Sequence, residues 1–269
     1  MNRTGRIEGR FRALRGRGEC AFVPFVTAGD PDLATTEAIV LALAESGADL
    51  IELGVPFSDP IAEGPTIQRS SERALRNRTS LRRVLGLVKS LRPKVEIPLI
   101  LMGYANPFYA MGEEGFAAAA AEVGVDGIIV PDLPPEEGEG LFLACEKRGV
   151  DVILLVAPTT TPARRELLAR RTRGFLYYVS LTGVTGARTA LAQGIRDGVA
   201  AVRAVSDIPV CVGFGVSTPA QAGEIASFAD GVVVGSALVE RIGRAASPEA
   251  AVDAAARFTA ELKAGIRRV

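Results

Sequence analysis

Short, almost unbroken apolar runs recur along the chain at fairly even intervals, and amphipathic stretches with helical spacing separate them. Unbroken hydrophobicity is typical of parallel strands that are covered on both faces. Eight such runs alternating with helices predict a (β/α)₈ barrel, a TIM barrel of the α/β class. The alternative is a doubly wound open sheet, but the stretch "FVTAGDPD" lacks the GxGxxG turn expected after its first strand. The runs cover residues 21–29, 50–56, 97–104, 127–132, 151–158, 175–180, 208–215 and 231–238.

The helical stretches carry recognisable start signals. Asp32 can cap a helix that follows it, and Ser247 followed by Pro248 predicts the start of the last helix. With 269 residues and no linker or low-complexity tract, we expect a single barrel domain over residues 1–269.

An arginine-rich stretch opens the chain. It could be a basic arm or an organelle-targeting segment, but Ile7, Phe11 and Leu14 have helical spacing. We therefore expect an extra N-terminal helix that packs these three side chains beneath the barrel.

The charge balance and the cysteines limit the classes of partner and compartment. The 31 basic and 31 acidic residues cancel, which points away from nucleic acid and anionic membranes. No apolar run is long enough to span a bilayer, and no signal-peptide core follows Met1. The three cysteines are far apart without CxxC spacing, as expected for free thiols in the cytoplasm.

The chain contains no histidine. This excludes a Ser-His-Asp triad, a Cys-His pair and a histidine-ligated metal site. Acid–base chemistry must therefore come from carboxylates, lysine, tyrosine or cysteine.

Glu52 lies inside the second apolar run, where an ionised carboxylate is costly to bury. Burial would raise its pKa and make it a usable proton donor, unless a distant cation pairs with it. The loop "PFSDPIAEGPTIQ" follows and contains Asp59 and Glu63. Asp59 precedes a proline in a turn-like context, so we expect it to be structural, whereas Glu63 can reach the pocket mouth.

Glycines mark the ends of the last strand runs. Gly213 and Gly215 close the seventh run, and Gly235-Ser236 closes the eighth and enters a short helix. Backbone N–H groups there can bind an anion, and these two loops are the customary phosphate site of such barrels. Gly186, after the sixth run, could add another N–H.

Six segments in order resemble the α subunit of tryptophan synthase: "FVPFVTAGDPD", "ADLIELGVPFSDPIAEGPTIQ", "GVDGIIVPDLPPEE", "VSLTGVTGAR", "VGFGVST" and "GVVVGSALV". The resemblance covers essentially the whole chain. It implies a lyase of tryptophan biosynthesis that cleaves indole-3-glycerol phosphate to indole and glyceraldehyde 3-phosphate, without metal or organic cofactor. It also implies a pyridoxal-phosphate β subunit as partner, in an α2β2 complex, or a stand-alone indole-releasing enzyme.

The resemblance assigns roles to individual residues. It implies that Glu52 is the general acid–base, that Glu63 steadies positive charge at the indole N–H, and that Tyr177 lies beside the site. The substrate-binding positions that it implies are Phe25 for the indole, Thr185 for loop closure, and Gly186, Gly215, Gly235 and Ser236 for the phosphate.

One position departs from the family pattern. The family usually reads "ADGPTIQ", but this chain reads "AEGPTIQ", so Glu63 stands where an aspartate is expected. This departure motivates an alternative function, a weakly active subunit that binds and activates a β partner. A different phosphate-binding barrel, such as a sugar-phosphate isomerase, is a further alternative.

Overall fold

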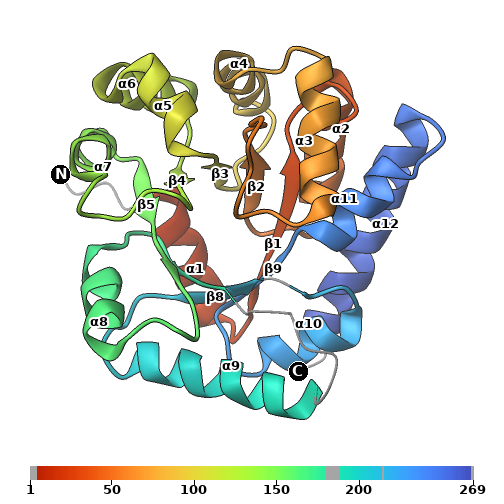
Figure 1. The fold of residues 1–269 in the computed structure, drawn as a ribbon. Coiled ribbons are helices and arrows are strands. Elements are labelled where there is room, and N and C mark those ends of the chain that lie inside the picture. Colours follow the sequence, from red (N-terminus) through yellow and green to blue (C-terminus); the bar gives the residue numbers. More distant parts are fainter. Residues whose placement is uncertain (1–4, 180–187, 214, 268–269) are drawn as a thin grey trace.

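The computed structural model describes residues 5–179, 188–213 and 215–267. Its strands form one sheet in which every pair is parallel, and the helices lie around the outside of this sheet (Figure 1). The strand order is β5-β4-β3-β2-β1-β9-β8-β7-β6. The strands are β1 (Ala21–Thr27), β2 (Ile51–Gly54), β3 (Leu99–Met102), β4 (Gly127–Ile129), β5 (Asp151–Ile153), β6 (Leu155–Val156), β7 (Leu176–Val179), β8 (Val210–Gly213) and β9 (Gly231–Val234).

The barrel prediction is confirmed, with one difference in the strand count. The fifth apolar run, 151–158, forms two strands, because pairing is interrupted at Leu154 between β5 and β6. These two strands stand at the two ends of the strand order, β5 beside β4 and β6 beside β7. The chain itself therefore joins the two ends of the sheet and nearly closes the barrel.

Twelve helices are present in the described residues, and they include the expected capping. The Asp32 side chain accepts a hydrogen bond from the Thr35 N–H, and α12 begins at Pro248 as predicted. The helices are α1 (Arg6–Gly16), α2 (Leu33–Glu45), α3 (Pro65–Arg76), α4 (Leu81–Leu91), α5 (Ala105–Met111), α6 (Glu113–Val123), α7 (Glu139–Lys147), α8 (Pro162–Arg171), α9 (Arg188–Arg203), α10 (Pro219–Ala226), α11 (Ser236–Gly243) and α12 (Pro248–Arg267).

The N-terminal helix α1 covers the end of the barrel where the strands begin. Ile7, Phe11 and Leu14 are buried, as their spacing predicts, and they join the apolar cluster inside the barrel. The Arg6 guanidinium also donates to Asp126, which immediately precedes β4. The side chains of α1 therefore fill the interior at this end of the barrel.

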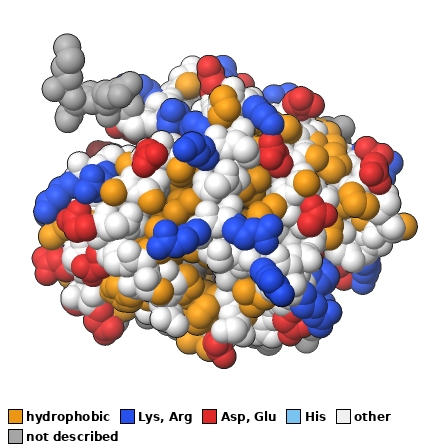
Figure 2. All heavy atoms as spheres, turned by 90° about the horizontal axis from the view of Figure 1, so that it is seen from above, with side chains coloured by type: hydrophobic (Ala, Val, Ile, Leu, Met, Phe, Trp, Pro, Cys, Tyr) orange, Lys and Arg blue, Asp and Glu red, His pale blue; other side chains and the backbone are white. Residues whose placement is uncertain are grey.

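The outer surface carries both signs of charge. On the face shown in Figure 2, basic and acidic side chains are interspersed, as the equal numbers of basic and acidic residues lead one to expect. In the described part of the chain, no helix has the length and apolarity that a membrane crossing needs.

Candidate active site

Glu52 lies in the middle of β2, beside Phe25 of β1 and Ile100 of β3 in the strand register. Its residue exposure is 0%. Neither carboxylate oxygen has a hydrogen-bond partner among the described residues. Burial, and secondarily the charge of Glu63, raises the pKa of Glu52 to about 8. Glu52 is therefore mostly protonated at neutral pH.

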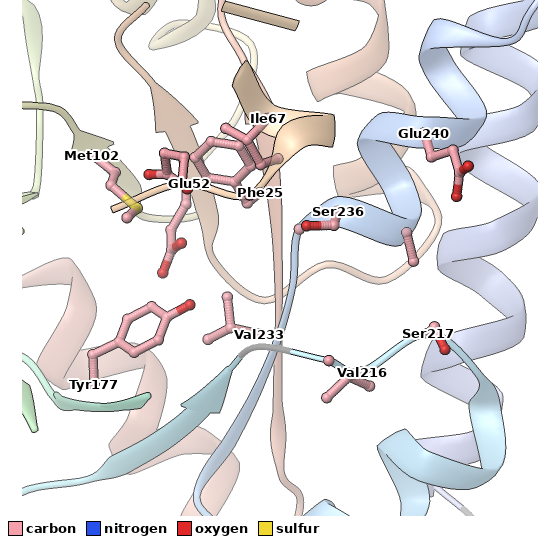
Figure 3. Close-up of a pocket in the computed structure, with 15 residues that line it drawn as sticks. Phe25, Glu52, Ile67, Met102, Tyr177, Val216, Ser217, Val233, Ser236 and Glu240 are labelled. Carbon is pink, nitrogen blue, oxygen red and sulfur yellow. The ribbon is translucent and has the colours of Figure 1, made fainter. Parts of the chain in front are cut away.

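A cavity of about 360 Å³ opens beside Glu52 at the carboxyl ends of the strands. Figure 3 shows Glu52, Met102 and Tyr177 grouped at one end of this cavity, with Ser236 and Ser217 toward the other. The cavity is lined by Phe25, Glu52, Glu63, Gly64, Ile67, Met102, Tyr177, Gly215, Val216, Ser217, Val233, Gly235, Ser236, Ala237 and Glu240. One end is thus largely apolar with a buried acid, and the other is rich in glycine and serine.

The second carboxylate of the cavity is Glu63, as the sequence predicts. It is partly exposed, and burial raises its pKa to about 7. Asp59 is exposed and accepts a hydrogen bond from the neighbouring Ser58 hydroxyl, as expected of a turn residue. The predicted loop is shorter than expected, because α3 begins at Pro65, where proline is favoured at a helix start.

Tyr177 and Phe25, both predicted site residues, line the cavity from β7 and β1. Burial, together with the charge of Glu52, raises the pKa of Tyr177 well above its usual range, so its hydroxyl is protonated. Gly213 makes room for this ring, since a Cβ there would lie 2.3 Å from the tyrosine hydroxyl oxygen. Gly213 therefore shapes the site, and only Gly215 of that pair lines the cavity.

The glycine-rich end has the features of an anion site. Gly215 has a φ of +82°, a conformation that favours glycine. Gly235 is the N-cap of α11, and Ser236 is its first residue. The free N–H groups and the positive end of the helix dipole therefore face the cavity.

Several cavity residues were not singled out from the sequence. Ile67, Met102 and Val233 extend the apolar wall, and Glu240 lies one turn after Ser236 and forms a 2.6 Å ion pair with Arg244. Met102 ends β3, so the rule that sites form at strand ends could have identified it. The sequence offered no such signal for Glu240.

Two predicted residues, Thr185 and Gly186, lie outside the described residues. The other predicted positions, Phe25, Glu52, Glu63, Tyr177, Gly215, Gly235 and Ser236, all line the one cavity.

The chain is similar to known proteins of one family. The family model of the tryptophan synthase alpha chain matches residues 11–267. The tryptophan synthase alpha chain of Geobacter sp. (strain M21) is 57% identical over 235 residues, which are 87% of this chain and 88% of the relative. That of Geotalea uraniireducens (strain Rf4) is 53% identical over 264 residues, which are 98% of each chain.

Solved structures give the same result. Tryptophan synthase subunit alpha from Legionella pneumophila str. Paris is 38% identical with a TM-score of 0.92, over 99% of this chain and 100% of that one. The aminoacrylate-bound tryptophan synthase from M. tuberculosis is 38% identical with a TM-score of 0.88, over 98% and 100%. Since the family model spans nearly the whole chain and relatives exceed half identity, this chain belongs to the tryptophan synthase alpha chain family.

Proposed function

We propose that Glu52 and Glu63 carry the retro-aldol cleavage of indole-3-glycerol phosphate in this chain. The reaction is that of the tryptophan synthase alpha chain, a carbon–carbon lyase of tryptophan biosynthesis, and it yields indole and glyceraldehyde 3-phosphate. The observation that carries the residue assignment is Glu52, a fully buried carboxylic acid without a hydrogen-bond partner among the described residues, at the wall of the cavity.

Cleavage requires protonation of the indole ring and deprotonation of a hydroxyl group of the substrate. A proton from Glu52 adds to the indole ring carbon that bears the side chain, which makes this carbon a leaving group. The resulting carboxylate then takes the proton of the adjacent hydroxyl, the carbon–carbon bond breaks, and the hydroxyl carbon becomes the aldehyde. A pKa of about 8 suits both steps, since the acid is protonated at neutral pH and still gives up its proton readily.

Glu63 provides the complementary charge. Protonation of the ring carbon places positive charge on the indole nitrogen, and a carboxylate beside the N–H stabilises it. The pKa of Glu63, about 7, leaves this group ionised in a large part of the molecules at neutral pH. Two carboxylic acids in different environments can thus hold different roles.

The rest of the cavity matches the rest of the substrate. Phe25, Ile67, Met102 and Val233 offer an apolar wall for the indole, with Tyr177 beside Glu52. We assign the phosphate to Gly215, Gly235 and Ser236, because the start of α11 presents N–H groups there. Thr185 and Gly186 stay predictions, for loop closure and for a further phosphate N–H.

We also propose a pyridoxal-phosphate β subunit as the partner that consumes the indole. Members of this family partner the β subunit, and one structural neighbour is a tryptophan synthase in an aminoacrylate-bound form. The three cysteines are free thiols, which supports the cytoplasm as the compartment. A weakly active interaction subunit is not favoured, because both carboxylates line the one cavity that also holds the glycine-rich end.

The test is indole release from indole-3-glycerol phosphate by the purified chain, alone and with a tryptophan synthase β subunit. We expect release in both cases, faster in the complex. The variant Glu63→Asp then tests the fit of the glutamate. The rate falls in this variant if the site is built around glutamate, and it rises if glutamate impairs the site. No indole from the chain in either condition would refute the proposal.

A further inference from the structure

The segment that carries Glu63 is held by hydrogen bonds on both sides of this residue. The Ala62 N–H donates to the Tyr104 hydroxyl oxygen over 2.9 Å. The Gln68 side-chain amide donates to the Glu63 carbonyl oxygen, also over 2.9 Å. The Glu63 N–H itself donates to the Pro60 carbonyl oxygen over 3.0 Å. The peptide groups on both sides of Glu63 are therefore hydrogen-bonded.

Tyr104 is well placed to act as an anchor. It lies two residues after β3, at the N-cap of α5, and is 4% exposed, so its ring is held at the top of the barrel. Its ring stacks on Phe57 of the same loop, with the ring centroids 5.2 Å apart and the planes at 26°. The loop is thus held at two points, one by stacking and one by the hydroxyl group.

The anchor is also close to the carboxylate. Tyr104, Phe57, Pro60 and Glu63 border the same small gap beside the main cavity. Burial raises the pKa of Tyr104 to about 12, and the charge of Glu63 adds to this rise. The Tyr104 hydroxyl is therefore protonated, and one of its oxygen lone pairs is occupied by the Ala62 N–H.

We infer that Tyr104 and Gln68 are positioning residues for Glu63, which set the backbone from which its carboxylate reaches the substrate. Glutamate has one methylene more than the aspartate usual at this position, so its carboxylate has a longer reach and one more rotatable bond. Hydrogen bonds to the backbone on both sides of Glu63 leave these side-chain torsions free, but they fix the position of the Cα from which the side chain extends. A misplacement of about 1 Å costs on the order of 10²-fold in rate, so loss of either hydrogen bond should lower turnover. This inference rests on the proposed function of Glu63.

Tyr104→Phe removes the hydroxyl and keeps the stacked ring. Losing one hydrogen bond of this kind should lower kcat about five- to tenfold, with KM changed less than twofold. The acid limb of the kcat/KM profile, which reports Glu63, should move to lower pH, because a less restrained carboxylate is better solvated and its pKa falls.

Tyr109→Phe is the matched control. Tyr109 lies on α5, is exposed, and donates over 3.3 Å to the Glu137 carbonyl oxygen, away from the cavity. The same atom is removed, so a general effect of losing a tyrosine hydroxyl on this side of the barrel would appear in both variants. We expect the control to keep the wild-type kcat and pH profile.

A double-mutant cycle decides whether Tyr104 acts through Glu63 or on the substrate directly. In a Glu63→Gln background, measured with more enzyme, Tyr104→Phe should lower kcat no further. An equal loss in both backgrounds, or no loss in the wild-type background, would overturn the inference. Absence of activity in the wild-type chain would instead refute the proposed function.

Gln68→Met removes the second hydrogen bond, the one to the Glu63 carbonyl oxygen. Gln68 is exposed, so the variant should fold even if Tyr104→Phe does not. We expect a two- to fivefold lower kcat and the same direction of shift in the acid limb. A wild-type kcat and profile in this variant would overturn the role of Gln68.

Discussion

Two buried acids, Asp49 and Glu52, lie three residues apart at the start of β2 and have opposite surroundings. Asp49 accepts hydrogen bonds from the Lys263 ammonium group of α12 and from the Phe22 N–H. Glu52 has no hydrogen-bond partner among the described residues and is more deeply buried. One acid is thus paired with a cation, and the other is held in a site where its neutral form is favoured.

The same contrast separates the two ends of the barrel. At the end covered by α1, Asp126 forms ion pairs with Arg6 and Arg92 at 2.9 and 2.8 Å and also accepts from the Leu99 N–H. At the open end, Glu52 and Glu63 share a cavity, and burial raises both pKa values. At the covered end, Asp49 and Asp126 are paired with cations, although burial also raises the pKa of Asp151 there to about 6. At the open end, the raised pKa values of Glu52 and Glu63 carry a cost in stability that a reaction can use.

The strongest test of this contrast is Glu52→Gln. The amide keeps the size of the side chain but cannot donate and recover a proton, so turnover should fall by about 10²–10⁴-fold. Substrate binding should change little, because the residues that we propose for the phosphate and the indole are not altered. The measurement is indole release together with a binding titration. Unchanged turnover would contradict the role of Glu52.

Asp49→Asn tests the other member of the pair. It leaves the Lys263 ammonium group buried without a countercharge, so the free energy of unfolding should fall by about 3–5 kcal/mol. The kcat of the folded fraction should stay within about twofold of the wild type, since neither partner lines the cavity. Denaturant titration gives the first quantity. A loss below about 1 kcal/mol would mean that this pair is not a main stabilising contact.

The pH dependence of stability should show the cost of burying Glu52. Folding raises the pKa of Glu52 from 4.5 to about 8, so its neutral form favours the folded state. Its contribution is fully present below about pH 4.5 and is lost as pH rises to about 8. Glu52→Gln has no such loss and should be more stable than the wild type by about 2–4 kcal/mol at pH 8.5. Parallel stability curves for both proteins between pH 5 and 8.5 would refute this.

The smallest effect concerns the rate profile. In the proposed mechanism Glu63 is ionised and Glu52 is protonated, so kcat/KM should fall below about pH 7 and above about pH 8. Each limb should approach a tenfold change per pH unit. In Glu63→Gln the acid limb should disappear while the basic limb stays. A profile that is flat from pH 6 to 9 would show that neither group titrates in the rate-limiting step.

Much of this arrangement could be read from local sequence. The apolar runs predict the strands, because strands covered on both faces need continuous hydrophobicity. Glu52 is recognisable as an acid inside such a run, and Gly215, Gly235 and Ser236 follow from the rule that barrels bind phosphate after their last strands.

Other features needed the folded chain. Lys263 is 214 residues from Asp49 in sequence, and nothing near either residue predicts the pair. Gly213 reads as a ligand-binding glycine, but its neighbour in space is the Tyr177 ring. The hydrogen bond from the Ala62 N–H to the Tyr104 hydroxyl oxygen joins the loop after β2 to the segment after β3.

By itself, the sequence determined the alternation of strands with helical segments, the helix starts at Asp32 and Pro248, and the absence of histidine chemistry. These depend on local periodicity, on capping and on composition, which need no knowledge of distant neighbours. The tertiary structure alone decided that Asp49 is paired with a cation and that Glu52 has no hydrogen-bond partner among the described residues. Desolvation and pairing depend on groups brought together from distant parts of the chain, and only the closed barrel places Lys263 beside Asp49 and leaves Glu52 facing the cavity.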